Sequence, residues 1–483
     1  MPSPRTINIP LVIALLALPP IICFGLDLPH PAVAAIFITT IGLWLTEAVP
    51  LPATGLLVPV LAAWYGVLPA PKAFDSYGSD ILFLFLGCFL MSRAMEKYGF
   101  DKRLAYFLLG KCLPGSSFLS INLVLGVASF ALSMWISNTS AAAILTAVTI
   151  GILASLEQHI PDEPTRKRVS VRLLLTVAFA ASIGGLATPV GSPPNLIAVS
   201  LLAREGIQIS FIEWLAIGLP ISVVMLVVML VVFELCFPLR HLKFPGIQKQ
   251  FNKLLRELGP MKVGEIEIAV VFLITIALWV LPGVLKSLFP ESSTIATIDS
   301  RLTMSIVGLM GGISMFFLPV QHKRAVNPNL TWEETNKIEW GTLMLFGGGL
   351  TLGLILEQSG AAKDIGGALF AGDLSKPVII GAIVILASIL MSEFASNTAA
   401  AAILIPLIIG ATIHQGVDQH IAMTLVLAAT FGASFGFMLP VSTPPNAIVY
   451  GTGKVPAREM RRAGVFFDIA GALVIIGYVY LAI

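Results

Sequence analysis

One nine-residue segment occurs twice in this sequence, as SNTSAAAIL at residues 137–145 and as SNTAAAAIL at residues 396–404. Each copy lies within an apolar region, at about residues 117–157 and 377–414, that has room for two short helices but is interrupted by polar residues at its centre. Non-helical backbone is tolerated at membrane depth only where it is buried in protein or lines a cavity. We therefore predict two re-entrant helical hairpins with the Ser-Asn-Thr triplets at their tips.

Two further motifs recur in the same order and at nearly the same spacing. Gly87, Glu96 and Gly99 match Gly348, Glu357 and Gly360, and Ser192-Pro-Pro-Asn195 matches Thr443-Pro-Pro-Asn446. Three ordered matches indicate an internal repeat. We assign an extra first transmembrane helix to residues 8–25, repeat 1 to 31–237, a cytoplasmic connection to 238–264 and repeat 2 to 265–483.

The composition is that of an integral membrane protein. Of 483 residues, 57% are hydrophobic and 12% are charged, whereas about a quarter of the residues in soluble domains are charged. Because a helix needs about 20 apolar residues to cross a bilayer, we predict one all-α polytopic unit over residues 1–483, with about eleven transmembrane helices plus the two hairpins. The predicted crossings lie near residues 8–25, 31–48, 52–68, 79–96, 172–203, 211–237, 265–284, 302–320, 340–357, 421–452 and 464–482.

The positions of lysine and arginine predict the orientation. With a cytoplasmic N-terminus, most of these residues fall in inner loops, for example Arg166-Lys167-Arg168 and Arg461-Arg462, as the positive-inside rule requires. The C-terminus is then outside, and the chain is a multi-pass protein of the inner (plasma) membrane. The first hairpin enters from the inside and the second from the outside, so the repeats are inverted. Inverted repeats are typical of secondary transporters whose site lies at the repeat interface.

Other functional classes are disfavoured. The basic residues form no stripe that would bind nucleic acid, and the four cysteines, Cys23, Cys88, Cys112 and Cys236, lack the spacing of a zinc site or a disulfide framework. An enzyme would need a nucleophile with its base or a metal motif such as HExxH, and neither is present. No cofactor is expected. A channel would need a continuous pore with rings of charge or carbonyls.

The hairpin tips have the chemistry of an anion site. A helix that starts at Ser137-Asn138-Thr139 or at Ser396-Asn397-Thr398 directs free N–H groups and a partial positive charge toward the tip. A single small-residue run such as Ala141–Ala143 is usually only a helix-packing surface. The paired occurrence in both halves favours a binding site over packing alone.

The proline pairs add candidate cation sites. Pro193-Pro194 and Pro444-Pro445 break their helices in mid-crossing, and the freed carbonyls around 190–192 and 441–443 are available to a hard cation. No arginine or lysine occurs in these motifs. A dianion would therefore be neutralised by helix ends, amide donors and co-bound cations, which predicts cation coupling. Two hydroxyls lie one helical turn before the triplets, on Ser133 and Ser392.

Three charged residues lie near membrane depth. Glu393 is an intramembrane carboxylate and a functional candidate by default, but its counterpart in the first half is Met134, and its role stays open. Glu47 and Arg93 are explained equally well by structural ion pairs.

At these residues the sequence resembles the divalent anion sodium symporters, the INDY-type family that includes sodium-dependent dicarboxylate, citrate and sulfate transporters. The resemblance covers nearly the whole chain. It rests on WLTEAVPLP at 44–52, the two triplets, the two Pro-Pro motifs, and a late pattern of Ser434, Phe437, Pro440, Val441, Ser442, Asn446, Ile448 and Val449.

The resemblance implies a homodimer in which a transport domain moves like an elevator against a scaffold. It also implies three sets of binding residues. The substrate set is Ser137, Asn138, Thr139, Ser192, Pro193, Ser396, Asn397, Thr398, Thr443 and Pro444. The first sodium set is Ser133, Ser137, Asn138 and Gly191, and the second is Ser392, Ser396, Asn397 and Ser442. Some relatives have Thr or Ala where this chain has Ser392 and Ser442.

The expected function is secondary transport of small di- or tricarboxylates, of the succinate, malate and fumarate class, by sodium symport. Sodium-independent dicarboxylate exchange is the alternative, and Asn138 and Asn397 favour sodium over it. Sulfate is another possible substrate, although two separated triplets suit two carboxylates better than one compact anion. The expected partners are these anions, sodium as coupling ion, the lipid bilayer and a second copy of the chain.

Overall fold

A computed structural model provides the fold. It describes residues 8–111, 117–156, 160, 162–239, 242–244, 247–322, 325–361, 364, 377–413 and 416–482. Cys112 and the predicted hairpin ends at residues 157 and 414 lie outside these ranges.

The described part of repeat 1 and the preceding helix are helical throughout. The first elements are α1 (Ile9–Gly25), α2 (Pro31–Thr46), α3 (Leu51–Trp64), α4 (Ala70–Phe74), η1 (Asp75–Gly78), α5 (Asp80–Tyr98) and α6 (Phe100–Lys111). They are followed by α7 (Phe118–Ser133), α8 (Asn138–Leu156), α9 (Glu163–Gly184), η3 (Pro189–Gly191), α10 (Pro193–Arg204) and α11 (Phe211–Cys236).

The second half follows the connecting helix α12 (Ile247–Glu257). Its first elements are α13 (Val263–Leu288), α14 (Ser293–Arg301), α15 (Met304–Ser314), β1 (Pro319–His322), β2 (Ala325–Pro328) and η4 (Trp332–Lys337). Its last are α16 (Trp340–Ser359), α18 (Pro377–Phe394), α19 (Asn397–Thr412), α20 (Gln419–Ala433), α21 (Pro444–Gly451) and α22 (Ala457–Ala482).

Several of these helices have the length and apolarity of membrane spans. Within the described residues, α11, α13, α16 and α22 qualify individually, and the pair formed by α4–η1 and α5, bent by 40°, qualifies as a fifth. Nine further apolar helices of 10–17 residues are shorter than a full crossing. The structure is therefore a multi-helix membrane protein with several apolar spans, and the count of eleven stays a prediction.

Each predicted hairpin is a pair of helices with a short break at the triplet. Helix α7 contacts α8, and α18 contacts α19. The predicted crossings at 172–203 and 421–452 are also broken, because α10 and α21 begin at the proline pairs, at Pro193 and Pro444. Proline suits the first helical turn, where its missing N–H has no intrahelical partner. The re-entrant position of the hairpins relative to a bilayer stays a prediction.

The prediction at residues 302–320 was wrong in its second half. Helix α15 ends at Ser314, and the chain then forms an antiparallel hairpin of β1 and β2. The backbone turns back here because Leu330 N–H donates to the carbonyl of Met315 and Asn329 N–H to that of Leu318. The chain is therefore not strictly all-α. The helices α6, α12 and α14 were also missed, because they are short and lie in more polar sequence.

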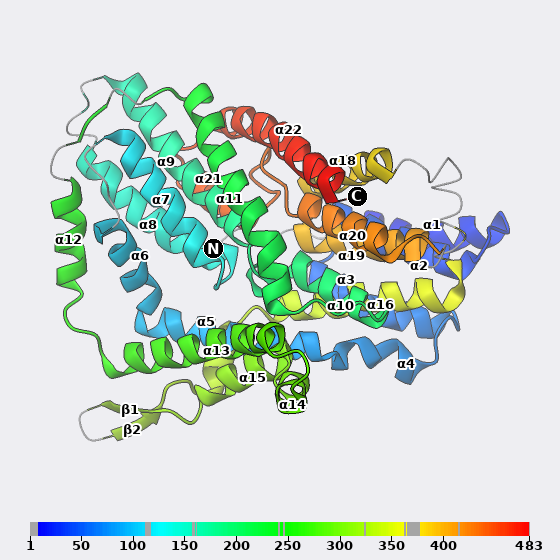
Figure 1. The fold of residues 1–483 in the computed structure, drawn as a ribbon. Helices are drawn as coiled ribbons and strands as arrows, with labels where there is room; N and C mark the ends of the chain where they lie inside the picture. Colours follow the sequence, from blue (N-terminus) through cyan, green and yellow to red (C-terminus); the bar gives the residue numbers. More distant parts are fainter. Residues whose placement is uncertain are drawn as a thin grey trace.

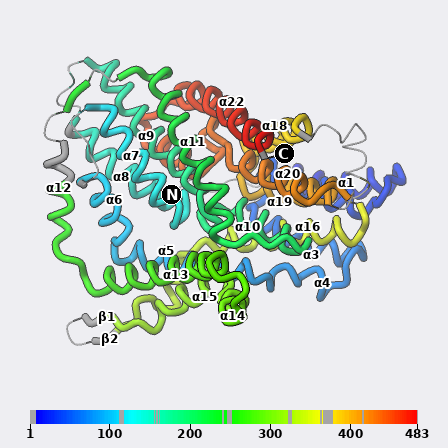
Figure 2. Tube along the Cα trace, in the orientation of Figure 1, coloured from blue at the N-terminus to red at the C-terminus, as the bar shows by residue number. Residues whose placement is uncertain are grey.

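The two halves of the chain are interleaved in space. In Figure 1, α5, α13, α14 and α15 lie along one side of the molecule, while α7, α8, α9 and α11 lie on the other with α22 beside them. Helices α6 and α12 run along the edge between these groups, as the tube in Figure 2 also shows, and they contact each other. Helix α9 is at the centre, since all its residues from Val169 to Gly184 are buried.

Glycine contacts join one half of the chain to the other. A Cβ at Gly87 of α5 would overlap the backbone of Gly308 in α15, and a Cβ at Gly348 of α16 would lie 2.6 Å from the Cα of Gly55 in α3. Small residues allow helix backbones to approach this closely in membranes. Helices α5 and α16 each end at a glycine in the left-handed conformation. These glycines, Gly99 and Gly360, both have φ of +74°. The repeated Gly87 and Gly348 thus lie at equivalent contacts.

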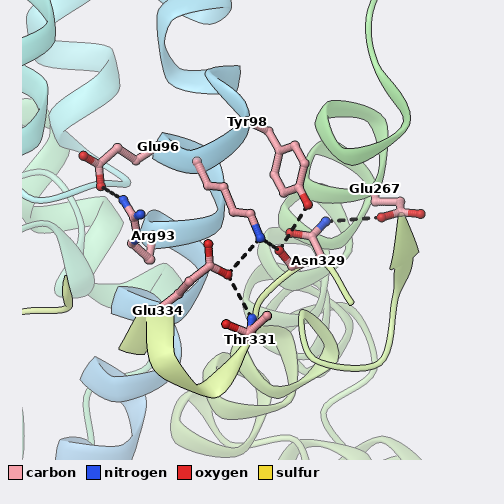
Figure 3. Close-up of polar contacts among 8 residues, drawn as sticks. Arg93, Glu96, Tyr98, Glu267, Asn329, Thr331 and Glu334 are labelled. Atoms are coloured by element: carbon pink, nitrogen blue, oxygen red, sulfur yellow. Dashed lines mark hydrogen bonds and ion pairs between the residues drawn. The ribbon is translucent and has the colours of Figure 1, made fainter. Parts of the chain in front are cut away.

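A polar cluster ties the end of α5 to the second half of the chain (Figure 3). The Lys97 ammonium donates to the carbonyl of Asn329 and to Glu334, both at 2.8 Å, and the Asn329 amide donates to Glu267 at 3.2 Å. Arg93 pairs with Glu96 on the same helix at 2.5 Å. The structural interpretation of Arg93 is therefore confirmed.

We expect Gly87→Val to destabilise the protein by about 1–3 kcal/mol, the usual cost of overpacking, because the added atoms collide with the backbone of α15. Thermal unfolding of the detergent-solubilised protein measures this. Gly151→Val is the matched control, since a Cβ at Gly151 meets nothing within 4 Å. Equal melting temperatures for the two variants would contradict the close α5–α15 contact.

Candidate functional site

The two triplets and the two proline motifs meet at one cavity of about 320 Å³. All ten residues of the predicted substrate set line it: Ser137, Asn138, Thr139, Ser192, Pro193, Ser396, Asn397, Thr398, Thr443 and Pro444. The opposite wall comes from α3, α5 and the start of α16, and includes Phe85, Phe89, Ser92 and Thr342. The volume of the cavity is at the lower end of the range for small-molecule binding sites. The repeats therefore build one shared site for a small ligand.

Four helices begin at this cavity. Their first residues are Asn138 of α8, Pro193 of α10, Asn397 of α19 and Pro444 of α21. The N-terminus of a helix carries a partial positive charge and unpaired N–H groups, which suit an anion. Among the described residues that line the cavity there is no lysine or arginine, and the one carboxylate is that of Glu339. Helix ends and amides thus supply the positive potential.

Serine and threonine hydroxyls cap three of these helices. Ser137 accepts from the N–H of Ser140 at 3.3 Å, Ser396 from Ala399 at 3.2 Å, and Thr443 from Asn446 at 3.4 Å. The serines of the triplets therefore fix where α8 and α19 begin. The asparagine and threonine that follow are placed in the first turn, facing the cavity.

Two equivalent asparagines hold the breaks before α10 and α21. The Asn195 amide donates to the carbonyls of Gly185 and Thr188, both at 2.8 Å. The Asn446 amide donates to the carbonyls of Gly436 and Leu439, both at 3.1 Å. Each asparagine is fully buried. The repeat therefore extends to individual hydrogen bonds, and these amides satisfy carbonyls that the helix breaks leave free.

An oxygen cluster lies behind the tip of the first hairpin. The hydroxyl of Ser133 donates to the amide carbonyl of Asn138 at 2.5 Å. The same end of that amide lies 3.3 Å from the carbonyl oxygen of Gly191 and 3.2 Å from that of Ala181. These four oxygens need positive charge between them, from the NH₂ of a turned amide or from a cation. Three of the four residues in the predicted first sodium set meet here, with Ala181 in addition.

A similar cluster lies behind the second hairpin. The hydroxyl of Ser392 donates to Asn397 Oδ1 at 2.8 Å and to the carbonyl of Ala433 at 2.7 Å, and the Asn397 amide donates to the carbonyl of Ser434 at 3.4 Å. Sequence reasoning missed the carbonyls of Ala181, Ala433 and Ser434. No residue type marks a backbone oxygen, so only the fold identifies them.

Some residues of the predicted sodium sets have other partners in the structure. The hydroxyls of Ser137 and Ser396 cap helices, as described above. The hydroxyl of Ser442 donates to the carboxylate of Glu393 at 2.7 Å. The same carboxylate accepts from the backbone N–H groups of Met438 at 2.8 Å and Leu439 at 3.2 Å. Glu393 thus anchors the break before α21 to the second hairpin.

Broken helices from both halves of a membrane protein that meet at one cavity are typical of multi-pass membrane transporters. The sodium:sulfate symporter transmembrane region matches residues 4–481, and the chain belongs to this family. It is 33% identical over 463 residues to proteins named sodium-dependent dicarboxylate transporter SdcS from Staphylococcus aureus strains USA300, NCTC 8325 / PS 47 and COL. Each match covers 94% of this chain and 86% of the relative. The protein is accordingly a transporter and not an enzyme.

We expect Asn195→Asp and Asn446→Asp to destabilise the protein by about 1–3 kcal/mol each, because a carboxylate cannot donate to the carbonyls that the amide now satisfies. The measurement is thermal unfolding in detergent at neutral pH. Asn336→Asp, at an exposed position, is the matched control. If either buried variant had the same melting temperature as the Asn336→Asp control, the helix breaks would be shown to hold without these hydrogen bonds.

Proposed function

We propose that this protein carries small di- or tricarboxylates, of the succinate, malate and fumarate class, across the membrane together with sodium ions. The observation that carries the proposal is a cavity bounded by four helix N-termini, with an oxygen cluster at each hairpin. Within the described part of the chain, no basic side chain lines this cavity. The name of the Staphylococcus relatives supports the same substrate class.

The geometry suggests how substrate and sodium depend on each other. A sodium ion among Ser133, Asn138, Ala181 and Gly191 would attract the Asn138 amide carbonyl and leave its NH₂ free to donate to a carboxylate in the cavity. An ion beside Ser392 and Asn397 would do the same at the second tip. Each ion also offsets part of the charge of a dianion in a low-dielectric site. Substrate and sodium therefore bind better together than alone.

The arrangement of the tips favours a dicarboxylate. One carboxylate meets Asn138 and Thr139, and the other meets Asn397 and Thr398. Hydrogen bonds from neutral donors and helix ends hold both groups without an arginine. Such a site releases its anion when the ions leave, as a transporter requires.

We expect labelled succinate to enter empty proteoliposomes only when an inward sodium gradient is imposed. Potassium in place of sodium and protein-free liposomes are the controls. Uptake that ignores sodium but requires internal succinate would establish exchange instead. If succinate uptake is absent under both conditions, citrate and sulfate are the next substrates to measure.

Removing either tip asparagine should weaken sodium binding. Asn138→Ala and Asn397→Ala each lose one ion ligand, so the sodium concentration for half-maximal uptake should rise about tenfold, equivalent to about 1.4 kcal/mol. Asn336→Ala at an exposed position should leave it unchanged. If the sodium concentration for half-maximal uptake were unaltered in both tip variants, the oxygen clusters would not be the sites at which sodium couples to transport.

We also propose that the protein lies in the inner (plasma) membrane with its N-terminus inside and its C-terminus outside, as a homodimer with an elevator-like motion. The charge distribution supports the orientation, and the equivalent contacts of Gly87 and Gly348 support inverted repeats. A thiol-specific reagent that does not cross membranes should label a C-terminal cysteine, but not an N-terminal one, in intact cells. The reverse labelling would overturn the orientation, and a monomeric mass in native mass spectrometry would overturn the dimer.

A further inference from the structure

Asp468 of α22 is a buried carboxyl group that the transport site described above does not use. Its side chain is 5% exposed. By distance and angle neither carboxyl oxygen has a well-formed hydrogen bond among the described residues. The carboxyl of Glu393 and the backbone of Phe437 nevertheless lie close enough to interact with it, so Asp468 is buried beside a second acid.

Two glycines show that α22 presents Asp468 to the break before α21. Gly464 lies one turn before Asp468 and Gly471 one turn after it, on the same face of the helix. A Cβ at Gly464 would overlap the backbone of Phe437, and a Cβ at Gly471 would overlap the ring of Phe435. The helix is therefore pressed against this segment on both sides of Asp468, and the carboxyl points into it.

The carboxylate that Asp468 faces already accepts three hydrogen bonds. Glu393 is fully buried, and its carboxylate accepts from the N–H groups of Met438 and Leu439 and from the hydroxyl of Ser442. Within the part of the chain that the structure describes, no ion pair connects Glu393 or Asp468 to a lysine, arginine or histidine.

Two buried carboxyl groups that face each other need either a shared proton or a bound cation between them. Burying one unpaired carboxylate is costly, and a second one beside it adds repulsion at low dielectric. The first repeat has no such acidic pair, because Met134 occupies the position equivalent to Glu393. There the equivalent connection is a hydrogen bond from the Thr188 hydroxyl to the carbonyl of Met134, at 2.6 Å. In the first repeat this connection is therefore made without an acidic group.

We propose that Glu393 and Asp468 bind a sodium ion of their own, in addition to the ions at the two oxygen clusters. Carboxylate and hydroxyl oxygens are ligands for hard cations, and Ser442, which also lines the substrate cavity, contributes its hydroxyl. The proposal rests on the proposed sodium-coupled function and extends it. The ion at Glu393 and Asp468 is linked through Ser442 to the cavity, so its binding strengthens that of the substrate dianion.

The test is the number of sodium ions bound by the purified protein, measured by equilibrium binding of radioactive sodium at saturation without substrate. We expect Asp468→Asn and Glu393→Gln each to bind one ion fewer per protomer than the wild type. Asp468→Asn should fold well, because its amide supplies the hydrogen-bond donor that the carboxyl pair lacks. Its melting temperature without sodium should equal or exceed that of the wild type, and sodium should raise it less.

Asp101→Asn is the matched control, since Asp101 of α6 is another buried carboxyl that lines no part of the cavity. It should bind as many ions as the wild type. An unchanged number of ions in Asp468→Asn would overturn the proposal and identify a proton shared by the two carboxyls. A wild type that binds no sodium would instead refute the proposed sodium coupling, so the two failures are distinguishable.

Discussion

Every polar backbone group at a helix break inside a membrane protein must find a partner, and this requirement organises the whole structure. Four breaks converge on the cavity, two at the Ser-Asn-Thr triplets and two before the proline pairs. Serine and threonine hydroxyls cap the helices that start there, and the amides of Asn195 and Asn446 bind the carbonyls left free. The remaining polar side chains of the hairpin tips line the cavity, whereas the amide oxygens of Asn195 and Asn446 are buried without a hydrogen-bond partner among the described residues. The side chains available to bind a ligand are therefore those that the helix breaks do not use for their own hydrogen bonds.

The helices around the breaks are arranged by close packing. Glycines let α5 meet α15 and α16 meet α3, so each contact joins one repeat to the other. Helices α3, α5 and α16 supply the wall of the cavity opposite the tips. Helices α6 and α12 connect this wall to the hairpin side of the molecule and lie at its edge (Figure 1). Such an arrangement leaves few covalent connections between the two sides, which suits a relative movement between them.

The electrostatics of the site differ between the two halves. The cavity relies on helix ends in place of basic side chains, so anion binding depends on whatever positive charge is nearby. Both halves have an oxygen cluster at the hairpin, but only the second has a buried carboxylate beside it, in Glu393, with Asp468 behind. The repeats therefore share their backbone architecture while differing in charge. The two sides of the site therefore differ in the charged groups that lie near them.

The sequence alone determined the class of the protein, the positions of the two hairpins and proline breaks, and the ten cavity residues. Each depends on local chemistry that repeats along the chain: apolar length, a polar triplet, a proline pair. The missing parts depend on neighbours far apart in sequence. The carbonyls of Ala181 and Ala433 join the oxygen clusters only because folding brings them to the side chains of Asn138 and Ser392. Likewise Asp468 is one acid in an apolar helix until α22 packs on the break before α21, because burial and proximity are properties of the tertiary structure.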